Sequence, residues 1–309
     1  MNIMYNNLCC FEILKHWSIT RVTGIDSTKY LNSQITVNLF NLKDNNHILC
    51  AHCSANGKVH SILRLFHYDN GYMYIQRHCT TELQIFELKK YSIFSNIQIN
   101  TISEYFLLGV MGMHAKNILL LYFNNLPNHN SPLIILKDII ILWFPEPIER
   151  FLVICKKNDL FLIKNFLLKK LIPMVYDKWL FLDITAGIPI LEEKMSKKFF
   201  PQNMNLELLH AIDFNKGCYC GQEMIAKIHF KKTNYKKLFC LIGISYDTID
   251  LFSTIEVFQN FQWKKIGKIF FIFYVQHNIF ILQCILKNSD FMNCIFRIHH
   301  NKKSKFFIF

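Results

Sequence analysis

The spacing of hydrophobic and polar residues predicts a mixed region of strands and helices. Short alternating runs are typical of half-buried strands, and apolar residues every three or four positions are typical of helices. The elements do not follow a strict βαβ order, so the pattern favours an α+β fold. We expect strands at residues 17–22, 48–53, 61–68, 105–110, 134–143 and 150–155, and helices at 27–34, 81–90 and 159–171.

The last quarter of the chain changes to a pattern of strands alone. Polar residues 276–278 divide the hydrophobic stretch 269–286 into two halves, as a turn between two strands does. The predicted strands are residues 238–245, 255–258, 265–274 and 279–286. This change marks a small β domain at the end of the chain.

Composition shows a folded protein of a size that allows more than one domain. The chain has 309 residues, of which 51% are hydrophobic and 15% aromatic, which excludes a disordered protein. Its net charge of +13 suggests anionic partners such as nucleic acid. However, the lysines are dispersed, and heavy use of Lys, Ile, Asn and Phe is what AT-rich codons produce. We therefore do not expect sequence-specific reading of nucleic acid.

Eleven cysteines at irregular spacing suggest free thiols rather than a disulfide framework. The N-terminus shows no secretory pattern, and no stretch approaches the roughly 20 apolar residues that span a bilayer, so we expect a cytoplasmic protein without a membrane segment. Cys50, Cys53, Cys218 and Cys220 offer four thiolates for a zinc or iron–sulfur site. Their spacing alone does not favour it, and no metal site is predicted.

The segment 216–227 is the strongest candidate for chemistry. Gly217 and Gly221 flank Cys218, and glycine can take a positive φ or let another backbone approach closely. A helix is expected to begin after Gly221. Cys218 would then feel the positive end of the helix and the neighbouring Lys216, which lowers the pKa of a thiol and favours a nucleophile or metal ligand. A cysteine that acts only as a small hydrophobic residue is the alternative.

This segment resembles the signature Lys-Gly-Cys-Tyr-x-Gly-Gln-Glu of the YgfZ family of folate-binding proteins, which are relatives of the aminomethyltransferase (T-protein) of the glycine cleavage system. Every specified position is present, as Lys216, Gly217, Cys218, Tyr219, Gly221, Gln222 and Glu223. Similar blocks occur in family order at residues 17–24, 29–31, 51–53, 57–58, 63–66, 87–91, 94–95, 179 and 186–189. Collinear blocks are more specific than one motif, and the resemblance extends from Trp17 to Lys237.

The resemblance implies a multi-domain aminomethyltransferase-like fold with a C-terminal all-β barrel. We expect residues 1–205 to form a folate-binding region of two α+β subdomains that need not be continuous in sequence. Residues 206–236 would hold the signature loop and helix, and residues 237–309 the barrel.

Trp17 and Trp179 match the tryptophans with which the family binds folate, and a flat pterin ring stacks well on an indole. Trp143 and Trp263 lie outside the matching blocks and are assigned to packing. The resemblance also makes Cys50 and Cys220 local substitutions rather than ligands.

The aminomethyltransferases use an Asp in the block that matches residues 57–64. This chain has no carboxylate there, and its His60 is the one acid–base side chain, a type that is more often structural when it occurs alone. An enzyme of aminomethyl transfer is therefore not expected. The resemblance implies a monomeric, cytoplasmic protein that binds tetrahydrofolate and supports iron–sulfur enzymes and tRNA modification, with an indirect influence on replication initiation. Direct tRNA binding, and folate-dependent one-carbon transfer to tRNA or a small amine, remain open as alternatives.

Overall fold

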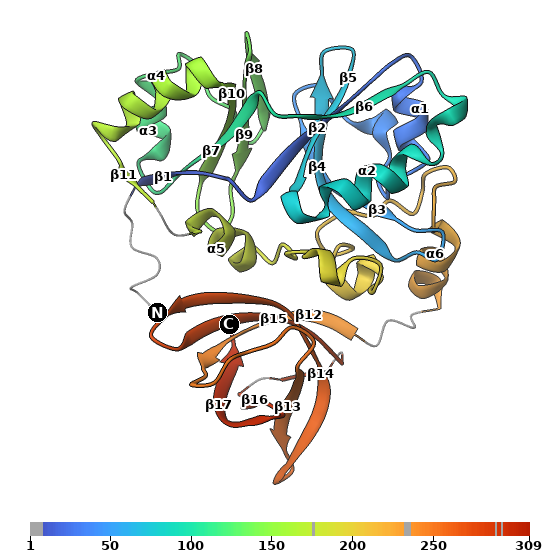
Figure 1. Ribbon diagram of the computed structural model, residues 1–309, viewed down its shortest axis with the longest axis vertical. Helices are drawn as coiled ribbons and strands as arrows, with labels where there is room; N and C mark the ends of the chain where they lie inside the picture. The colour runs from blue at the N-terminus through green and yellow to red at the C-terminus, as the bar shows by residue number, and fades with distance from the viewer. Residues whose placement is uncertain (1–8, 175–176, 232–235, 288, 292) are drawn as a thin grey trace. The chain divides into compact units, whose positions relative to one another are not determined.

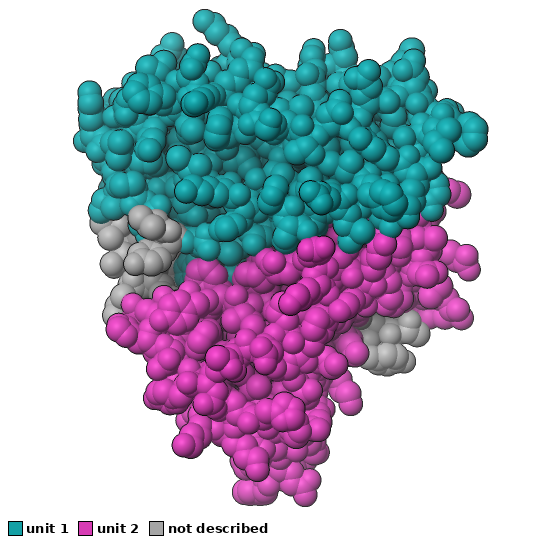
Figure 2. Space-filling model, viewed as in Figure 1, with its two compact units in different colours: residues 1–32, 38–49, 63–186 teal, residues 33–37, 50–62, 187–309 magenta. Residues whose placement is uncertain are grey.

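A computed structural model describes residues 9–174, 177–231, 236–287, 289–291 and 293–309. The chain forms two compact units that interleave in sequence, shown in different colours in Figure 2. Unit 1 comprises residues 1–32, 38–49 and 63–186, and unit 2 comprises residues 33–37, 50–62 and 187–309. Each unit is built from segments that lie far apart along the chain. The domain boundaries expected from the sequence are continuous ranges and stay a prediction.

A six-stranded sheet with two helices forms one part of unit 1. The strand order is β11-β1-β7-β10-β9-β8, antiparallel except for the parallel pair β1–β11. Helices α3 (Ala115–Leu120) and α4 (Lys157–Leu168) contribute Leu119, Ile163 and Leu167 to the buried core of this sheet. Figure 1 shows both helices beside the sheet. The strands are β1 (Cys10–Ile13), β7 (Tyr105–Met111), β8 (Leu133–Leu136), β9 (Ile139–Phe144), β10 (Arg150–Lys156) and β11 (Ile172–Pro173).

A second sheet has five strands in the order β3-β4-β5-β2-β6. Its strands are β2 (Trp17–Thr23), β3 (His47–Cys53), β4 (Val59–Tyr68), β5 (Gly71–Arg77) and β6 (Gln98–Ile102). Helices α1 (Ser27–Asn32) and α2 (Thr81–Lys89) follow strands of this sheet along the chain. Short 3-10 turns complete the described chain at Leu39–Asn41, His78–Thr80, Ser92–Phe94, Glu193–Met195 and Pro201–Met204. The α+β class predicted from the pattern is confirmed.

Several elements differ from the sequence prediction. The single strand expected at residues 134–143 is a hairpin of β8 and β9, because Lys137 takes a left-handed φ of 55° and reverses the chain. The sequence prediction lacks strands β1, β5, β6 and β11, helix α3, and the last two strands, β16 (Phe296–Ile298) and β17 (Asn301–Ile308). Trp179 lies in a helix, α5 (Lys178–Thr185), that the pattern also did not reveal.

The end of the chain is a closed six-stranded barrel, as the resemblance implied. Its order is β12-β15-β14-β13-β16-β17, and aliphatic and aromatic residues such as Leu282, Phe296 and Phe306 fill its core. Gln283 on β15 donates to the carbonyl of Ile188 and accepts from the N–H of Ile190, which fixes that segment to the barrel. The strands are β12 (Lys236–Ile244), β13 (Thr254–Gln259), β14 (Gln262–Gln276), β15 (Ile279–Lys287), β16 (Phe296–Ile298) and β17 (Asn301–Ile308).

Helix α6 (Gln222–Phe230) precedes the barrel in unit 2 and begins at the expected place, directly after Gly221. In the part of the chain that the structure describes, no helix is long and apolar enough to cross a bilayer.

Candidate functional site

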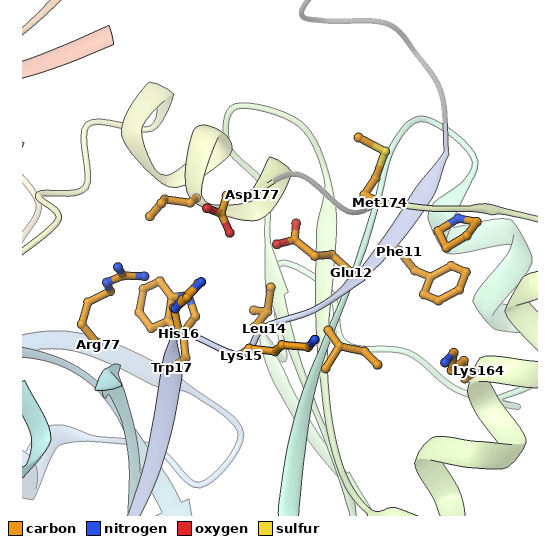
Figure 3. Close-up of a pocket in the computed structure, with 13 residues that line it drawn as sticks. Phe11, Glu12, Leu14, Lys15, His16, Trp17, Arg77, Lys164, Met174 and Asp177 are labelled. Carbon is orange, nitrogen blue, oxygen red and sulfur yellow. The ribbon is translucent and has the colours of Figure 1, made fainter. Parts of the chain in front are cut away.

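A pocket of about 290 Å³ lies in unit 1 where the end of β1 leads into β2 (Figure 3). Its walls come from both sheets of the unit and from the beginning of α5. Small-molecule sites in proteins range from about 300 to 1,000 Å³, so the pocket lies at the small end of that range and suits one fused ring system rather than a whole larger ligand. The residues that line it are Phe11, Glu12, Ile13, Leu14, Lys15, His16, Trp17, Arg77, Lys164, Pro173, Met174, Asp177 and Leu180.

Glu12 provides a buried carboxyl group in the wall of this pocket. The residue is 8% exposed, and its Oε2 accepts a hydrogen bond of 3.0 Å from the backbone N–H of Trp179 in the first turn of α5. Burial raises the pKa of Glu12 to about 7, and the nearby charge of Asp177 adds to the rise, while the helix N–H groups oppose it. A carboxyl group with a pKa near 7 is suited to donate or accept a proton at neutral pH.

Trp17 and cationic side chains occupy another part of the pocket. Trp17 is the first residue of β2 and pairs with Arg77 of β5, whose guanidinium lies 5.6 Å from the centre of the indole ring. Lys15 and His16 are exposed in the connection that precedes Trp17. Figure 3 shows the carboxyl groups of Glu12 and Asp177 facing the same space, with Trp17 and Arg77 across from them. The pocket therefore has the carboxyl groups of Glu12 and Asp177 on one side and the indole and guanidinium of Trp17 and Arg77 on the other.

Trp179 is buried next to the pocket and is absent from its lining. Its ring is 3% exposed, packs edge-on against Phe144 and lies 4.4 Å from the guanidinium carbon of Arg150. A Cβ on Gly109 would approach Trp179 Cε3 to 2.5 Å, so a glycine is needed there to accommodate the ring. The predicted direct stacking of folate on Trp179 does not fit this packing. In this structure Trp179 reaches the pocket through its backbone N–H, which binds Glu12.

The raised pKa of Glu12 predicts a specific pH dependence of stability. The carboxyl keeps its proton in the folded protein up to about pH 7, whereas its ordinary pKa is 4.5. The stabilising effect of this proton is therefore complete below pH 4.5 and is lost as the pH rises through 7. We expect the melting temperature of the Glu12→Gln variant to rise relative to wild type between pH 5 and pH 7.5, measured by circular dichroism. An equal gain in Glu193→Gln, which removes an exposed carboxyl, would contradict this assignment to Glu12.

The signature segment lies in unit 2, where Gly221 is held against the turn that follows β3. Gly221 has a φ of +82° and begins helix α6. A Cβ on it would lie 2.4 Å from the carbonyl oxygen of Ser54 and 2.8 Å from the Cα of Gly57. The glycine at this position is thus required both by its backbone conformation and by the close approach. Gly217 needs neither, because it has no positive φ and a Cβ there meets no atom within 4 Å.

Lys216 secures the signature loop from inside the unit. The residue is 7% exposed, and its Nζ donates to the carbonyl oxygens of Ile35 and Val37 at 2.8 and 2.7 Å. Burial lowers the pKa of Lys216 to about 8. The ammonium also lies 4.9 Å from the ring centre of Tyr219, which is itself buried. Lys216 therefore holds two backbone carbonyls in place, and its expected influence on the Cys218 thiol stays a prediction.

Cys218 is exposed to solvent, unlike the other three cysteines considered as metal ligands. Cys50 and Cys53 are buried, Cys220 is partly buried, and burial strongly raises the pKa of the Cys53 thiol. Among the residues that the structure describes, no three His, Cys, Asp or Glu side chains come close enough together to hold a metal ion. The accessible thiol of the signature is thus Cys218.

The remaining signature residues and His60 have well-defined positions. Gln222 donates to the carbonyl of Lys216 at 3.4 Å, and Glu223 is exposed in the first turn of α6. His60 is buried and stacks on His52 with the ring centres 5.0 Å apart.

Sequence reasoning missed the polar residues that give the pocket its character. Glu12 and Arg77 come together with Asp177 only because β1 and β2 are adjacent along the chain and α5 begins beside β1. One signal for Glu12 was available: it is a single carboxylate within the apolar run Cys10-Phe11-Glu12-Ile13, and buried carboxylates need a partner or a function. The sequence around Asp177 and Arg77 contains no comparable indication that these residues line a pocket.

The fold defined by these sheets and this barrel is that of the aminomethyltransferases. The glycine cleavage system aminomethyltransferase T from Bartonella henselae matches with a TM-score of 0.80 and 13% identity, over 99% of this chain and 86% of that one. At this identity the likeness shows the fold alone. No protein-family model matches the chain.

Relatives of known sequence identify the family. The tRNA-modifying protein YgfZ of Buchnera aphidicola subsp. Baizongia pistaciae is 42% identical over 99% of this chain and 96% of its own length. The protein of the same name from subsp. Acyrthosiphon pisum is 41% identical over 96% of this chain and 94% of its own length. That of Hamiltonella defensa is 34% identical over 96% of this chain and 88% of its own. The chain therefore belongs to the YgfZ family, as its signature indicated.

Proposed function

We propose that this protein binds a reduced folate in the unit 1 pocket and acts as an accessory protein in tRNA modification. The observation that carries the proposal is the pairing, in one pocket, of a buried carboxyl group with an indole ring and cationic side chains. The family's relatives are named tRNA-modifying proteins, which supports the biological setting.

The chemistry of the pocket fits tetrahydrofolate from end to end. A pterin presents adjacent N–H donors that a carboxyl group accepts, and Glu12 with Asp177 supplies such acceptors. Its flat ring suits the face of Trp17. The glutamate tail is anionic and suits Arg77 and Lys15. Because the pocket measures about 290 Å³, the pterin fills it and the tail lies toward solvent.

The chain's own residues bind and orient the folate in this proposal. Folate when bound supplies a carrier for one-carbon units. Glu12 holds a proton or a pterin N–H at its carboxyl group, and the backbone N–H of Trp179 fixes the orientation of that carboxyl. Trp179 thus contributes as a positioning residue, and Trp17 as the ring contact.

The signature loop supplies the second part of the proposal. Cys218 is an exposed thiol on a loop that Lys216 and Gly221 hold in place. We propose that this thiol takes part in the maintenance of iron–sulfur enzymes that modify tRNA, since thiolates are good iron ligands and nucleophiles. The same proposal places the protein in the cytoplasm as a monomer, with an indirect effect on replication initiation through its tRNA targets.

A complementation experiment tests this role. In bacterial cells that lack their own family member, we expect the wild-type chain to restore methylthiolated tRNA, quantified by mass spectrometry of digested tRNA. Trp17→Ala and Cys218→Ser are each expected to restore less than about half of that level. Cys220→Ser is the matched control, because it removes a less accessible thiol of the same loop. Full restoration by Cys218→Ser would contradict the thiol's role.

A folate-dependent one-carbon transferase is the second candidate. The observation in its favour is Glu12, a carboxyl group in the pocket whose pKa of about 7 suits proton transfer. Single-turnover incubation with methylene-tetrahydrofolate and tRNA or a small amine distinguishes the two functions. The accessory role predicts that the methylene-tetrahydrofolate is not consumed, whereas the transferase predicts one equivalent consumed per protein.

A further inference from the structure

The hairpin of β13 and β14 in the barrel ends in a two-residue turn with an unusual composition. Gln259 pairs with Gln262, and Asn260 and Phe261 between them have φ values of 51° and 59°. Two successive left-handed residues define the turn type that favours Asn followed by Gly. In this turn Phe261 occupies the position that glycine prefers. Figure 1 shows the hairpin extending from the rest of the barrel.

The left-handed backbone of Phe261 is therefore unfavourable, and no packing of its side chain offsets the conformational cost. Its side chain is 94% exposed, so it contributes nothing to a buried core. A bulky residue in the left-handed region is a backbone outlier, and such outliers are concentrated at functional sites. A glycine would adopt the left-handed backbone without strain and would lose no buried contact. The side chain at this position is thus best explained by an external contact.

Two more aromatic rings lie directly behind the turn. Phe258 is 40% exposed and opposes Trp263 across the strands, with ring centres 5.2 Å apart. The guanidinium of Arg297 lies 3.9 Å from the Trp263 ring centre and is anchored by a 2.8 Å hydrogen bond to Glu256. A guanidinium held in place by Glu256 thus borders the aromatic surface of Phe258 and Trp263.

The charge around these rings is positive. Lys264, Lys265 and Lys268 are exposed on β14, against a single carboxylate, Glu256, within residues 254–276. That carboxylate is 4% exposed and is bound by Arg297 and by His299, whose Nδ1 lies 2.6 Å from it. Strand alternation places Lys265 on the same face of the hairpin as Phe258 and Trp263, whereas Lys264 pairs with the buried Val257 on the opposite face. Beyond the bulge, Lys268 pairs with Thr254 on the face of Lys265. An anionic partner on that face meets lysines and aromatic rings together, and the Glu256 carboxylate is already bound.

We propose that the β13–β14 hairpin is a binding surface for single-stranded RNA, with bases stacked on Phe261 and Phe258 and phosphates bound by Lys265 and Lys268. Exposed aromatic side chains interleaved with basic ones are the means by which proteins hold unpaired nucleotides. An acidic protein partner can also bury exposed rings, but unpaired nucleotides use the rings by stacking and the lysines by phosphate contact at every step. The inference goes beyond folate binding and uses residues that all lie in the barrel.

Fluorescence anisotropy with a labelled, unstructured 12-nucleotide RNA tests the proposal on the full-length chain. Phe261→Gly relieves the strained turn, so we expect it to fold at least as well as wild type and yet to bind RNA at least fivefold more weakly, the lower end of the loss of one base stack. Lys265→Gln with Lys268→Gln is expected to reduce the slope of log Kd against log salt by about 1.4, at about 0.7 for each phosphate that a lysine no longer neutralises.

The matched controls are exposed residues of the same kinds elsewhere on the barrel. Tyr274→Ala removes a ring that is 61% exposed at the other end of β14, and Lys302→Gln with Lys303→Gln removes two exposed lysines of β17. Both are expected to bind RNA as the wild type does. Wild-type affinity in Phe261→Gly, or an equal loss in Tyr274→Ala, would overturn the proposal. Tetrahydrofolate binding should be unchanged in every one of these variants, so a failure here is distinct from a failure of the folate site.

Discussion

Gly221→Ala is expected to destabilise the protein by about 3 kcal/mol or more, whereas Gly217→Ala is expected to cost less than about 1 kcal/mol. Gly221 has a φ of +82°, and an added Cβ would collide with the Ser54 carbonyl and the Gly57 backbone. Backbone atoms cannot move aside as a flexible side chain does, so the signature loop must separate from the turn after β3. Gly217 meets nothing within 4 Å.

The two alanine variants form a matched pair four positions apart in one motif. Urea unfolding followed by circular dichroism measures both free energies, and thiol labelling at Cys218 reports whether the loop has moved. We expect labelling to be faster in Gly221→Ala and unchanged in Gly217→Ala. Equal stability of the two variants would show that the close packing of Gly221 against Gly57 is not present in solution.

Arg150→Leu is expected to lower the free energy of unfolding by about 3–5 kcal/mol, because it leaves the buried carboxylate of Asp183 without its partner. Arg150 is fully buried, and its NH2 group donates to Asp183 Oδ1 at 2.7 Å while its NH1 group donates to the carbonyl of Trp179 at 3.1 Å. The pair therefore ties α5 to β10. Loss of the arginine also frees the first turn of α5, where Trp179 binds Glu12.

A double variant and a surface pair make this test specific. Arg150→Leu combined with Asp183→Leu removes both charges and is expected to be more stable than Arg150→Leu alone, since no ion remains buried without a partner. Arg21→Leu breaks the exposed ion pair with Asp69 and is expected to cost less than about 1 kcal/mol. If Arg150→Leu and Arg21→Leu lower the free energy of unfolding equally, the buried Arg150–Asp183 pair does not stabilise the fold more than a surface ion pair does.

The sequence predicted those features that depend on neighbouring residues. The turn at residues 276–278 is visible because polar residues interrupt a long apolar run, and the hairpin of β14 and β15 forms there. The start of α6 follows from Gly221. The β8–β9 hairpin was missed, because Lys137 and Asp138 interrupt a run of isoleucines that fits a single strand equally well.

The candidate site was less predictable, because its properties come from contacts between distant segments. Trp179 is buried by Gly109 and Arg150, which lie far from it in sequence, so no local pattern distinguishes it from Trp17. Gly217 and Gly221 look alike in the motif, and they differ only in the folded structure, where Gly221 has a positive φ and lies against Ser54 and Gly57. Glu12 acquires its raised pKa from burial beside α5, which follows it by more than 160 residues.

Tetrahydrofolate binding measured by isothermal titration calorimetry tests the central claim most directly. The wild-type protein is expected to bind one equivalent, and Trp17→Ala to bind about tenfold more weakly, a loss of ~1.4 kcal/mol that matches one aromatic stack. Trp143→Phe, which changes a tryptophan outside the pocket lining, is the control and should bind as the wild type does. Equal affinity of wild type and Trp17→Ala, or no binding by the wild type, would contradict the assignment of a folate to this pocket.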